Sequence, residues 1–444
     1  MSFIADKQTL DDLNLTGRYK QDSIFNLFNG VKTTGGEKLL EKMFRQPLAD
    51  PEQMNLRTRI FKYFQGKALT FPAGRQEFDV MENYISGGTP NPNLIFAGTG
   101  NLRKLVLAAA IKDEQYVTMQ TGILATIAIL KSFALFIDEF DDKDNPYAQQ
   151  LQIAKAFFND NRLNWLSWED AKKLSFSKTT FYDHLLRHTL QKEMQVLINI
   201  IYHIDVYIAV AGIAEEKNFT YATALPKQSN LIKAEGLYHP SLKNAVSNTL
   251  SLHQQSNLLF LTGANMAGKS TLMKTFGVAM YLAHLGFPVA AKQMEFSIMD
   301  GIYSSINVPD DLSMGYSHFY AEVLRVKTVA EEVSNGKDMV VIFDELFKGT
   351  NVKDAFDATL AVTEEFSAYK NCFFIISTHI IEVGDKLMEK ENVQFGYMPT
   401  LMDGNVPTYP YTMSEGITTD RQGMIIIENE GILEILNSAS TIPN

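Results

Sequence analysis

The segment that most constrains this structure reads Gly263-Ala264-Asn265-Met266-Ala267-Gly268-Lys269-Ser270-Thr271. It matches the pattern G-x-x-x-x-G-K-[ST], follows the apolar run 258–261 and opens a stretch of helical periodicity. That context is the one a phosphate-binding loop requires, because glycines let the backbone wrap around phosphates and the helix N-terminus adds N–H donors. We therefore expect all nine residues to bind a nucleotide, with Lys269 at its terminal phosphates and the Ser270 hydroxyl on Mg²⁺.

A second candidate element is an apolar strand that ends in two carboxylates, Met339–Phe343 followed by Asp344 and Glu345. If this strand lies next to the strand before the turn, Asp344 comes near the metal, through a water molecule. Glu345 then faces the γ-phosphate and can orient or deprotonate the attacking water. An ordinary strand end with two solvated carboxylates has the same sequence, but the phosphate-binding pattern upstream favours the functional interpretation.

Two further candidates are weaker on the residues alone. His379 follows the apolar strand pattern 375–378 and could hydrogen-bond the γ-phosphate or the lytic water, although a histidine at a strand end is more often structural. Ser317 lies in the polar loop Asp310–Glu322 before a helical pattern, where helix capping alone explains a serine.

Strand-length apolar runs alternate with helical patterns in the second half of the chain. The runs are 257–261, 338–343 and 371–377, and the helical patterns are 270–284, 321–333 and 354–369. This alternation predicts a parallel sheet with helices on both faces. The first half has helical periodicity at 36–44, 55–64, 116–140, 148–158 and 184–216. We expect a multidomain chain, with a helical domain at residues 1–225 and an α/β domain at residues 226–444.

Composition describes an acidic protein of a reducing compartment. The 444 residues carry 40 Lys and Arg against 51 Asp and Glu, and residues 226–444 hold 15 of the basic and 25 of the acidic residues. Tight non-specific binding to nucleic acid usually needs a basic surface, which this composition does not indicate. The single cysteine, Cys372, excludes a disulfide framework and favours the cytoplasm. The apolar stretch Met119–Ile137 contains Lys131 and several polar residues, which favour a buried helix over a membrane span.

Taken together, these elements resemble the ATPase domain of the MutS mismatch-repair family. Thr262–Thr271 is similar to the family's T-G-P-N-M-G-G-K-S-T, and Asp344–Thr350 is similar to its D-E-[IL]-G-R-G-T. The loop Asp310–Glu322 resembles its D-D-L-x-x-G-x-S-T-F-x-x-E, and Ser377-Thr378-His379 matches its [AS]-T-H. Residues 23–48 and 204–211 resemble parts of the family's helical core, so the likeness covers most of the chain.

This resemblance implies a helical core and lever domain followed by an ABC-like P-loop ATPase domain that uses ATP and Mg²⁺. It implies a homodimer with composite sites, in which Ser317 reaches the partner's nucleotide in trans, Asp344 and Glu345 handle metal and water, and His379 senses the γ-phosphate. It also implies slow, partner-stimulated hydrolysis of ATP to ADP and phosphate, and DNA binding in repair or recombination.

Departures from the family pattern leave a second interpretation open. We expect a short member that lacks the N-terminal mismatch-reading domain, and the space for a DNA clamp, Asn145–Thr180, is small. DNA binding should then be weaker than in full-length members. The alternative is a nucleotide-switched interaction protein that acts on a protein or RNA assembly.

Overall fold

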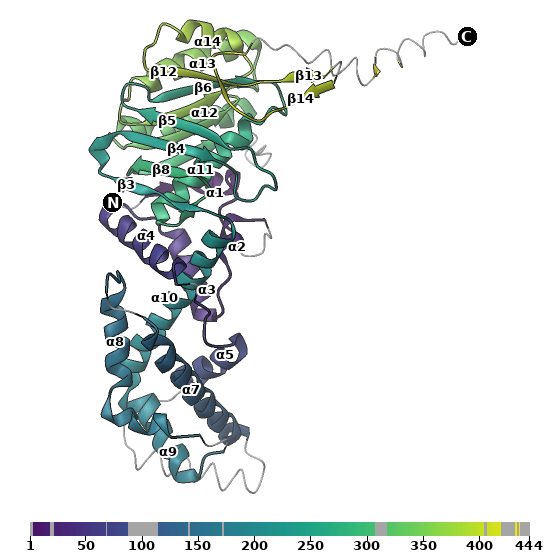
Figure 1. Cartoon of the computed structure of the whole chain (residues 1–444). Helices are drawn as coiled ribbons and strands as arrows, with labels where there is room; N and C mark the ends of the chain where they lie inside the picture. The colour runs from purple at the N-terminus through teal and green to yellow at the C-terminus, as the bar shows by residue number, and fades with distance from the viewer. Residues whose placement is uncertain are drawn as a thin grey trace. The chain divides into compact units, whose positions relative to one another are not determined.

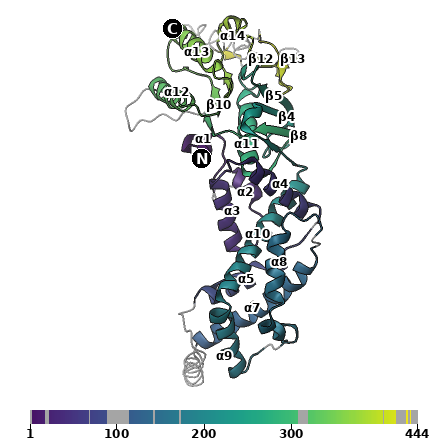
Figure 2. The ribbon, with the colours of Figure 1, turned by 90° about the vertical axis from the view of Figure 1, so that its left-hand side faces the viewer.

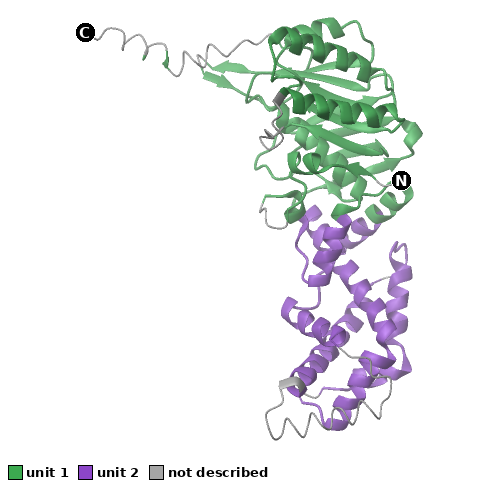
Figure 3. Ribbon diagram, turned by 180° about the vertical axis from the view of Figure 1, so that it is seen from behind, with its two compact units in different colours: residues 1–27, 44–58, 217–444 green, residues 28–43, 59–216 purple. Residues whose placement is uncertain are grey.

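The computed structural model describes residues 3–17, 22–67, 69–87, 114–140, 143–170, 173–306, 318–403, 406–418, 431–432 and 435. The chain forms two compact units, which Figure 3 shows in different colours. Unit 1 comprises residues 1–27, 44–58 and 217–444, and unit 2 comprises residues 28–43 and 59–216. Unit 1 is built on a sheet covered by helices, whereas unit 2 is helical (Figure 1). The predicted helical region followed by an α/β sheet domain is therefore confirmed.

The compact units are interleaved along the chain and do not follow the predicted boundary at residue 225. Residues 1–27, 44–58 and 217–225 pack in the same unit as the C-terminal sheet. Part of the first half therefore completes the α/β unit. The assignment of 1–225 and 226–444 as the two domains stays a prediction.

Unit 1 contains a seven-stranded sheet in the order β1-β9-β10-β11-β6-β12-β15. All neighbouring strands are parallel except β12 and β15. The strands are β1 (Ile4–Ala5), β9 (Gly301–Ser305), β10 (Met339–Asp344), β11 (Phe373–Ser377), β6 (Leu258–Gly263), β12 (Val393–Met398) and β15 (Ser414–Glu415). Parallel strands covered on both faces consist of apolar runs, and every residue of Met339–Phe343 and of Leu258–Leu261 is buried.

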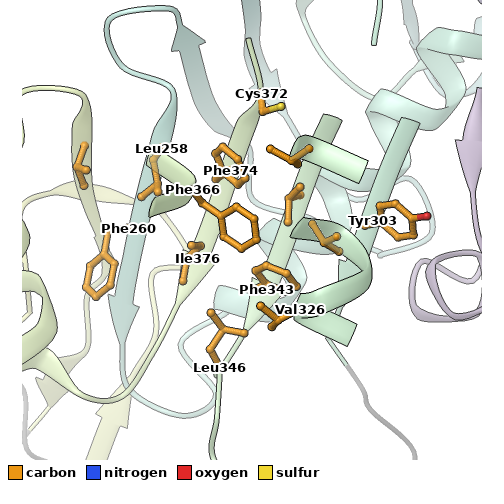
Figure 4. Close-up of a cluster of buried hydrophobic side chains, with 14 of the residues drawn as sticks. Leu258, Phe260, Tyr303, Val326, Phe343, Leu346, Phe366, Cys372, Phe374 and Ile376 are labelled. Atoms are coloured by element: carbon orange, nitrogen blue, oxygen red, sulfur yellow. The ribbon is translucent and has the colours of Figure 1, made fainter. Parts of the chain in front are cut away.

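Helices cover both faces of this sheet, as predicted, and Figure 2 shows them on either side of β10. One face holds α11 (Lys269–Leu285) and α1 (Lys7–Asp12), and the other holds α12 (His318–Ser334), α13 (Val352–Ser367) and α14 (Ile381–Leu387). Neighbouring side chains of a strand point to opposite faces. Ile342 of β10 accordingly contacts Gly277 of α11, whereas Phe343 joins an apolar cluster with Val326 and Phe366 (Figure 4).

The N-terminal segment adds an edge to the sheet that the sequence patterns do not predict. β1 pairs in parallel with β9, and the Asp6 carboxylate caps α1 through the N–H of Thr9 at 2.9 Å. The buried guanidinium of Arg325, on α12, donates to Asp6 at 3.0 Å and to the carbonyl of Ser304 at 2.7 Å. Since a buried charge needs such partners, the N-terminal segment also fixes α12.

A second, four-stranded sheet lies in the same unit, in the order β3-β8-β4-β5. Its strands are β3 (Thr223–Leu225), β8 (Gln293–Ser297), β4 (Leu231–Leu237) and β5 (Asn248–His253). Two short pairs complete the strands of the described part of unit 1, namely β2 (Thr220–Tyr221) with β7 (Pro288–Val289), and β13 (Leu401–Asp403) with β14 (Val406–Thr408).

Unit 2 is built from α-helices whose apolar faces pack together. They are α5 (Arg75–Ser86), α7 (Glu114–Asp138), α8 (Ala148–Phe158), α9 (Phe176–His184) and α10 (Gln191–Glu216), while α2 (Ile24–Phe28), α3 (Thr34–Arg45) and α4 (Pro51–Gln65) have residues in both units. The helix predicted at 184–216 is interrupted, because Leu185–Thr189 forms a π-helical turn before α10 begins. The buried carboxylate of Asp205 accepts the N–H groups of Lys32 at 2.9 Å and Thr33 at 2.7 Å, which ties α10 to the segment before α3.

Within the residues that the structure describes, two helices of unit 2 are long and apolar enough to cross a membrane, by length and composition alone. Their apolar stretches are Tyr116–Asp138 in α7 and Gln191–Glu216 in α10, and about half of each is buried inside the structure. Core helices pass the same test, and α7 packs against α5 and α8 while α10 packs against α8. The packing of α7 agrees with the predicted buried helix.

His284 of α11 is a fully buried neutral histidine. Its Nδ1 donates to the carbonyl of Met280 at 2.7 Å, and its Nε2 accepts the N–H of Met299 at 3.0 Å. The ring also lies 4.3 Å from the ring of Phe3, between centroids. Burial lowers the pKa of His284 from 6.5 to about 4. A second ring proton would point at the N–H of Met299, so protonation conflicts with this packing.

We expect His284 to make unfolding easier in mild acid. Between pH 6.5 and about 4 the unfolded chain binds a proton that the folded chain does not, so the free energy of unfolding falls as the pH falls. At 1.36 kcal/mol per pKa unit, the loss is about 2 kcal/mol between pH 7.5 and 5. Urea denaturation of the parent and of His284→Gln across this range measures it. The variant, which cannot take up the proton, should show the shallower pH dependence, and equal slopes would contradict the assignment.

Candidate nucleotide site

The predicted phosphate-binding segment forms the turn between β6 and α11. Gly263 and Gly268 have φ angles of 143° and 104°, which side chains other than glycine rarely adopt. The backbone is also crowded there, because a Cβ on Gly263 would lie 2.8 Å from the carbonyl oxygen of Met398, and one on Gly268 would lie 3.1 Å from the ring of Tyr411. Glycine is thus required at both ends of the turn, and the turn leads directly into the N-terminus of α11.

Lys269, the first residue of α11, folds its side chain back over the turn. The ammonium group donates to the carbonyls of Gly263 at 2.9 Å and Ala264 at 3.2 Å, and the residue is only 5% exposed. Burial lowers the pKa of Lys269, while the nearby carboxylates of Asp344 and Glu345 oppose that shift. A buried cation that is held mainly by neutral carbonyls is strongly stabilised when a multiply charged anion binds beside it.

Asp344 links the ends of two strands, β10 and β11, to the first turn of α11. Its carboxylate accepts hydrogen bonds from the hydroxyls of Ser270 and Ser377. The prediction that β10 lies next to β6 in the sheet is wrong, because β11 lies between these two strands. The predicted meeting of Asp344 with Ser270 nevertheless occurs, since parallel strands end at one edge and the carboxylate reaches across β11. Ser377 was not predicted as a partner of Asp344, although it is part of the Ser377-Thr378-His379 motif.

Glu345 and His379 form a pair beside this carboxylate. Nε2 of His379 lies 2.6 Å from Oε1 of Glu345, and Nζ of Lys348 lies 3.9 Å from Oε2. The hydrogen bond from His379 lowers the pKa of Glu345, so its carboxylate is ionised at neutral pH. The backbone N–H of Glu345 donates to the carbonyl of Ser377 at 3.0 Å, which fixes the start of the loop after β10.

A pocket of about 360 Å³ opens beside the turn. Residues of the turn and of α11, among them Met266 and Thr271, line one side of it. The rest is lined by residues from the end of β4, the loop before β5, the start of β5, the end of β12 and the segment before β15, and they include His239, Asn248 and Tyr411. Asn248 donates to the carbonyl of Tyr411 at 3.0 Å and accepts the N–H of Met413 at 2.7 Å, which closes the pocket wall. Burial and the charge of Lys274 lower the pKa of His239.

Sequence reasoning missed most of this pocket as a functional feature. His239 lies in Gly236–Pro240, which resembles a G-R-H-P pattern of the MutS family, so one signal was available. Asn248 and Tyr411 carry no motif, and they lie 163 positions apart along the chain. Only the fold brings them to the turn.

Ser317 lies outside the described residues, as does the rest of 307–317. α12 begins at His318, directly after it. The other predicted site residues lie in the same unit, around the β6–α11 turn and the adjoining strand ends.

The fold and this site define a class of protein that combines a helical region with an α/β domain. In the α/β domain, a glycine-bounded turn and carboxylates lie at one edge of the sheet. The family model of MutS domain V matches residues 259–444. The chain is also 28% identical over 280 residues to the DNA mismatch repair protein MutS of Petrotoga mobilis, a match that covers 61% of this chain and 34% of that protein. The chain is thus similar to MutS proteins, most clearly over the residues that the domain V model matches. The matched region is about a third of the length of that relative.

Proposed function

We propose that this protein binds and hydrolyses ATP, and that it couples the ATP state to a DNA structure in repair or recombination. The observation that carries the proposal is the meeting of a buried lysine, two serine hydroxyls and two carboxylates beside one glycine-bounded turn. Such a set matches the needs of a polyphosphate with a divalent cation.

A nucleotide would occupy two adjacent places, the turn for its phosphates and the pocket beside it for its base and sugar. The phosphates would be bound by the backbone amides between Gly263 and Thr271 and by the ammonium group of Lys269. The ammonium group would then give up its hydrogen bonds to two carbonyls and donate to charged phosphate oxygens in their place. The adjacent pocket, with His239 and Tyr411 in its wall, would hold the base and sugar. Its volume is in the range of small-molecule sites.

The donor set at Asp344 also fits Mg²⁺, which prefers oxygen ligands. Ser270 would hold the ion through its hydroxyl, and Asp344 would do so directly or through water, in place of their present hydrogen bond. When bound, Mg²⁺ supplies positive charge that neutralises the phosphates.

Glu345 would take a proton from the attacking water, because it is an ionised carboxylate at the end of β10. His379 would hold that carboxylate in place and sense the γ-phosphate. Ser317 would act from the partner subunit of a homodimer, which rests on the family resemblance alone. The protein would be an ATPase of the cytoplasm, slow without its partner.

DNA binding tests the proposal most directly. We expect duplex, mismatched or branched DNA to bind with a dissociation constant below about 1 µM at physiological salt in at least one nucleotide state. Fluorescence anisotropy without nucleotide, with ADP and with a non-hydrolysable ATP analogue would measure it. Binding weaker than this in every state would argue against a DNA substrate.

The charge distribution supports a second candidate function. Residues 226–444 carry ten more acidic than basic residues, and in the described part of 145–180 one tryptophan, Trp165, stacks on Tyr182 inside the unit while Trp168 is exposed beside Lys178. These features fit a nucleotide-switched protein that acts on a protein or RNA assembly. A co-purifying partner that stimulates ATP hydrolysis where DNA does not would favour it.

A further inference from the structure

The loop after β10 contains two non-glycine residues in the left-handed region of backbone space. Glu345 has a φ of 58° and Phe347 has a φ of 60°. For a residue with a bulky side chain this conformation is costly, and it persists only where the surroundings hold it. The family pattern that this loop resembles has glycine at the place of Phe347. A phenylalanine at this position therefore has a strained backbone, and the contacts of its ring must offset the energetic cost of that strain.

The ring of Phe347 is anchored in the apolar cluster between the sheet and α12. The residue is only 3% exposed, and its ring lies 6.0 Å from that of Phe319, between centroids, at 60°. Leu346 and Val326, labelled in Figure 4, belong to the same cluster. The backbone comes equally close, because a Cβ on Gly349 would lie 2.9 Å from the nitrogen of Phe319. The loop is thus pressed against the first turn of α12.

The other end of the loop carries the proposed base. Glu345 is fixed by its N–H to Ser377 and by the hydrogen bond from His379 to its carboxylate. Only Leu346 separates it from Phe347, and the carbonyl of Leu346 accepts a hydrogen bond from Thr359 at 3.4 Å. A rotation of the backbone at Phe347 would therefore be passed directly to Glu345.

We propose that Phe347 is a positioning residue for ATP hydrolysis: its ring, held against Phe319, keeps the loop in the strained conformation that aims the Glu345 carboxylate. The inference rests on the proposed ATPase function and names a residue outside the nucleotide pocket, whose lining does not include Phe347. A side chain that only fills the core would affect stability. A positioning side chain also affects kcat, without affecting nucleotide binding.

Phe347→Gly separates these roles, because glycine removes the ring and leaves the backbone free to move away from the left-handed conformation. We expect kcat to fall about tenfold or more, since small misplacements of a reacting group cost rate steeply. The dissociation constant for a fluorescent ATP analogue should stay within about twofold of the parent value, because the binding turn is untouched. Phe347→Leu, which restores most of the apolar contact, should recover kcat to within about threefold.

Two controls make the result specific. Phe366→Leu truncates another buried ring of the same cluster, which lies on α13 and packs on Phe374 of β11, and should lower the melting temperature with kcat unchanged. In a Glu345→Gln background, Phe347→Gly should cause no further loss of kcat, because residues that act as a unit are not additive. If Phe347→Gly does not fold, Phe319→Ala removes the partly buried partner of the ring contact and should lower kcat in the same way.

The outcomes distinguish this inference from the proposed function. A parent protein that hydrolyses ATP, with Phe347→Gly equal to it in kcat, overturns the positioning role alone. An additive loss in the Glu345→Gln background does so as well. A parent protein that neither binds nor hydrolyses ATP overturns the proposed function, and the positioning role with it.

Discussion

Lys269→Ala is expected to lose most of its nucleotide binding, with affinity for ATP about ten- to a hundredfold weaker than in the parent. The ammonium is the buried positive charge of the turn, and a hydrogen bond to a charged group contributes about 1.5–3 kcal/mol. At 1.4 kcal/mol per tenfold change in affinity, the upper end of that range corresponds to about two decades. Isothermal titration calorimetry with Mg·ATP measures the change.

The fold of this variant should persist. Lys269 is a desolvated cation whose pKa burial lowers, so its removal relieves a cost to the folded state. We expect the melting temperature without nucleotide to be unchanged or higher. Lys327→Ala is the matched control, because that lysine is exposed on α12 and pairs only weakly with Glu331 at 3.8 Å. If Lys269→Ala bound ATP as tightly as the parent, the assignment of the nucleotide site to this turn would be contradicted.

Glu345→Gln should bind ATP as the parent does and hydrolyse it at least about tenfold more slowly, a cautious value for the loss of a general base. Glutamine keeps the size and the acceptor for His379 but cannot take a proton from water. The hydrogen bond from His379 lowers the pKa of Glu345, so the parent carboxylate is already ionised at neutral pH. The deficit should therefore persist across neutral pH.

Phosphate release at saturating ATP, together with a separate binding titration, tests this prediction. Glu364→Gln is the control, since Glu364 is a partly exposed carboxylate on α13 that pairs with Lys390 at 3.4 Å. Equal hydrolysis rates in Glu345→Gln and the parent would assign the proton transfer to another group.

Local patterns predicted the elements of the site better than their arrangement. Strand ends at Asp344 and Ser377 could be located because buried parallel strands are continuous apolar runs. The lateral order of the strands is set by long-range packing, which is why β11 was not expected between β10 and β6. The pocket next to the turn is assembled from distant segments, so Tyr411 could not be linked to Gly268 before the fold was known.

Other features of the fold are too short or too irregular to be recognised from a periodic sequence pattern. β1 has only two residues, too few for an alternation to be recognised. The π-helical turn at Leu185–Thr189 interrupts a helix without any glycine or proline to mark it. The left-handed backbone at Phe347 contradicts the local preference of phenylalanine, and only its tertiary contacts account for it.

The Asp6–Arg325 pair has a consequence for how the chain matures on the ribosome. Its two members are 319 positions apart, so the N-terminal segment emerges long before the helix that needs it. At about 5–20 residues per second, that segment waits on the order of tens of seconds for its docking site. During this interval it is open to proteases and to capture by other nascent chains. A C-terminal fragment made without it would lack the Asp6 carboxylate that pairs with Arg325, and we expect such a fragment to accumulate in aggregates.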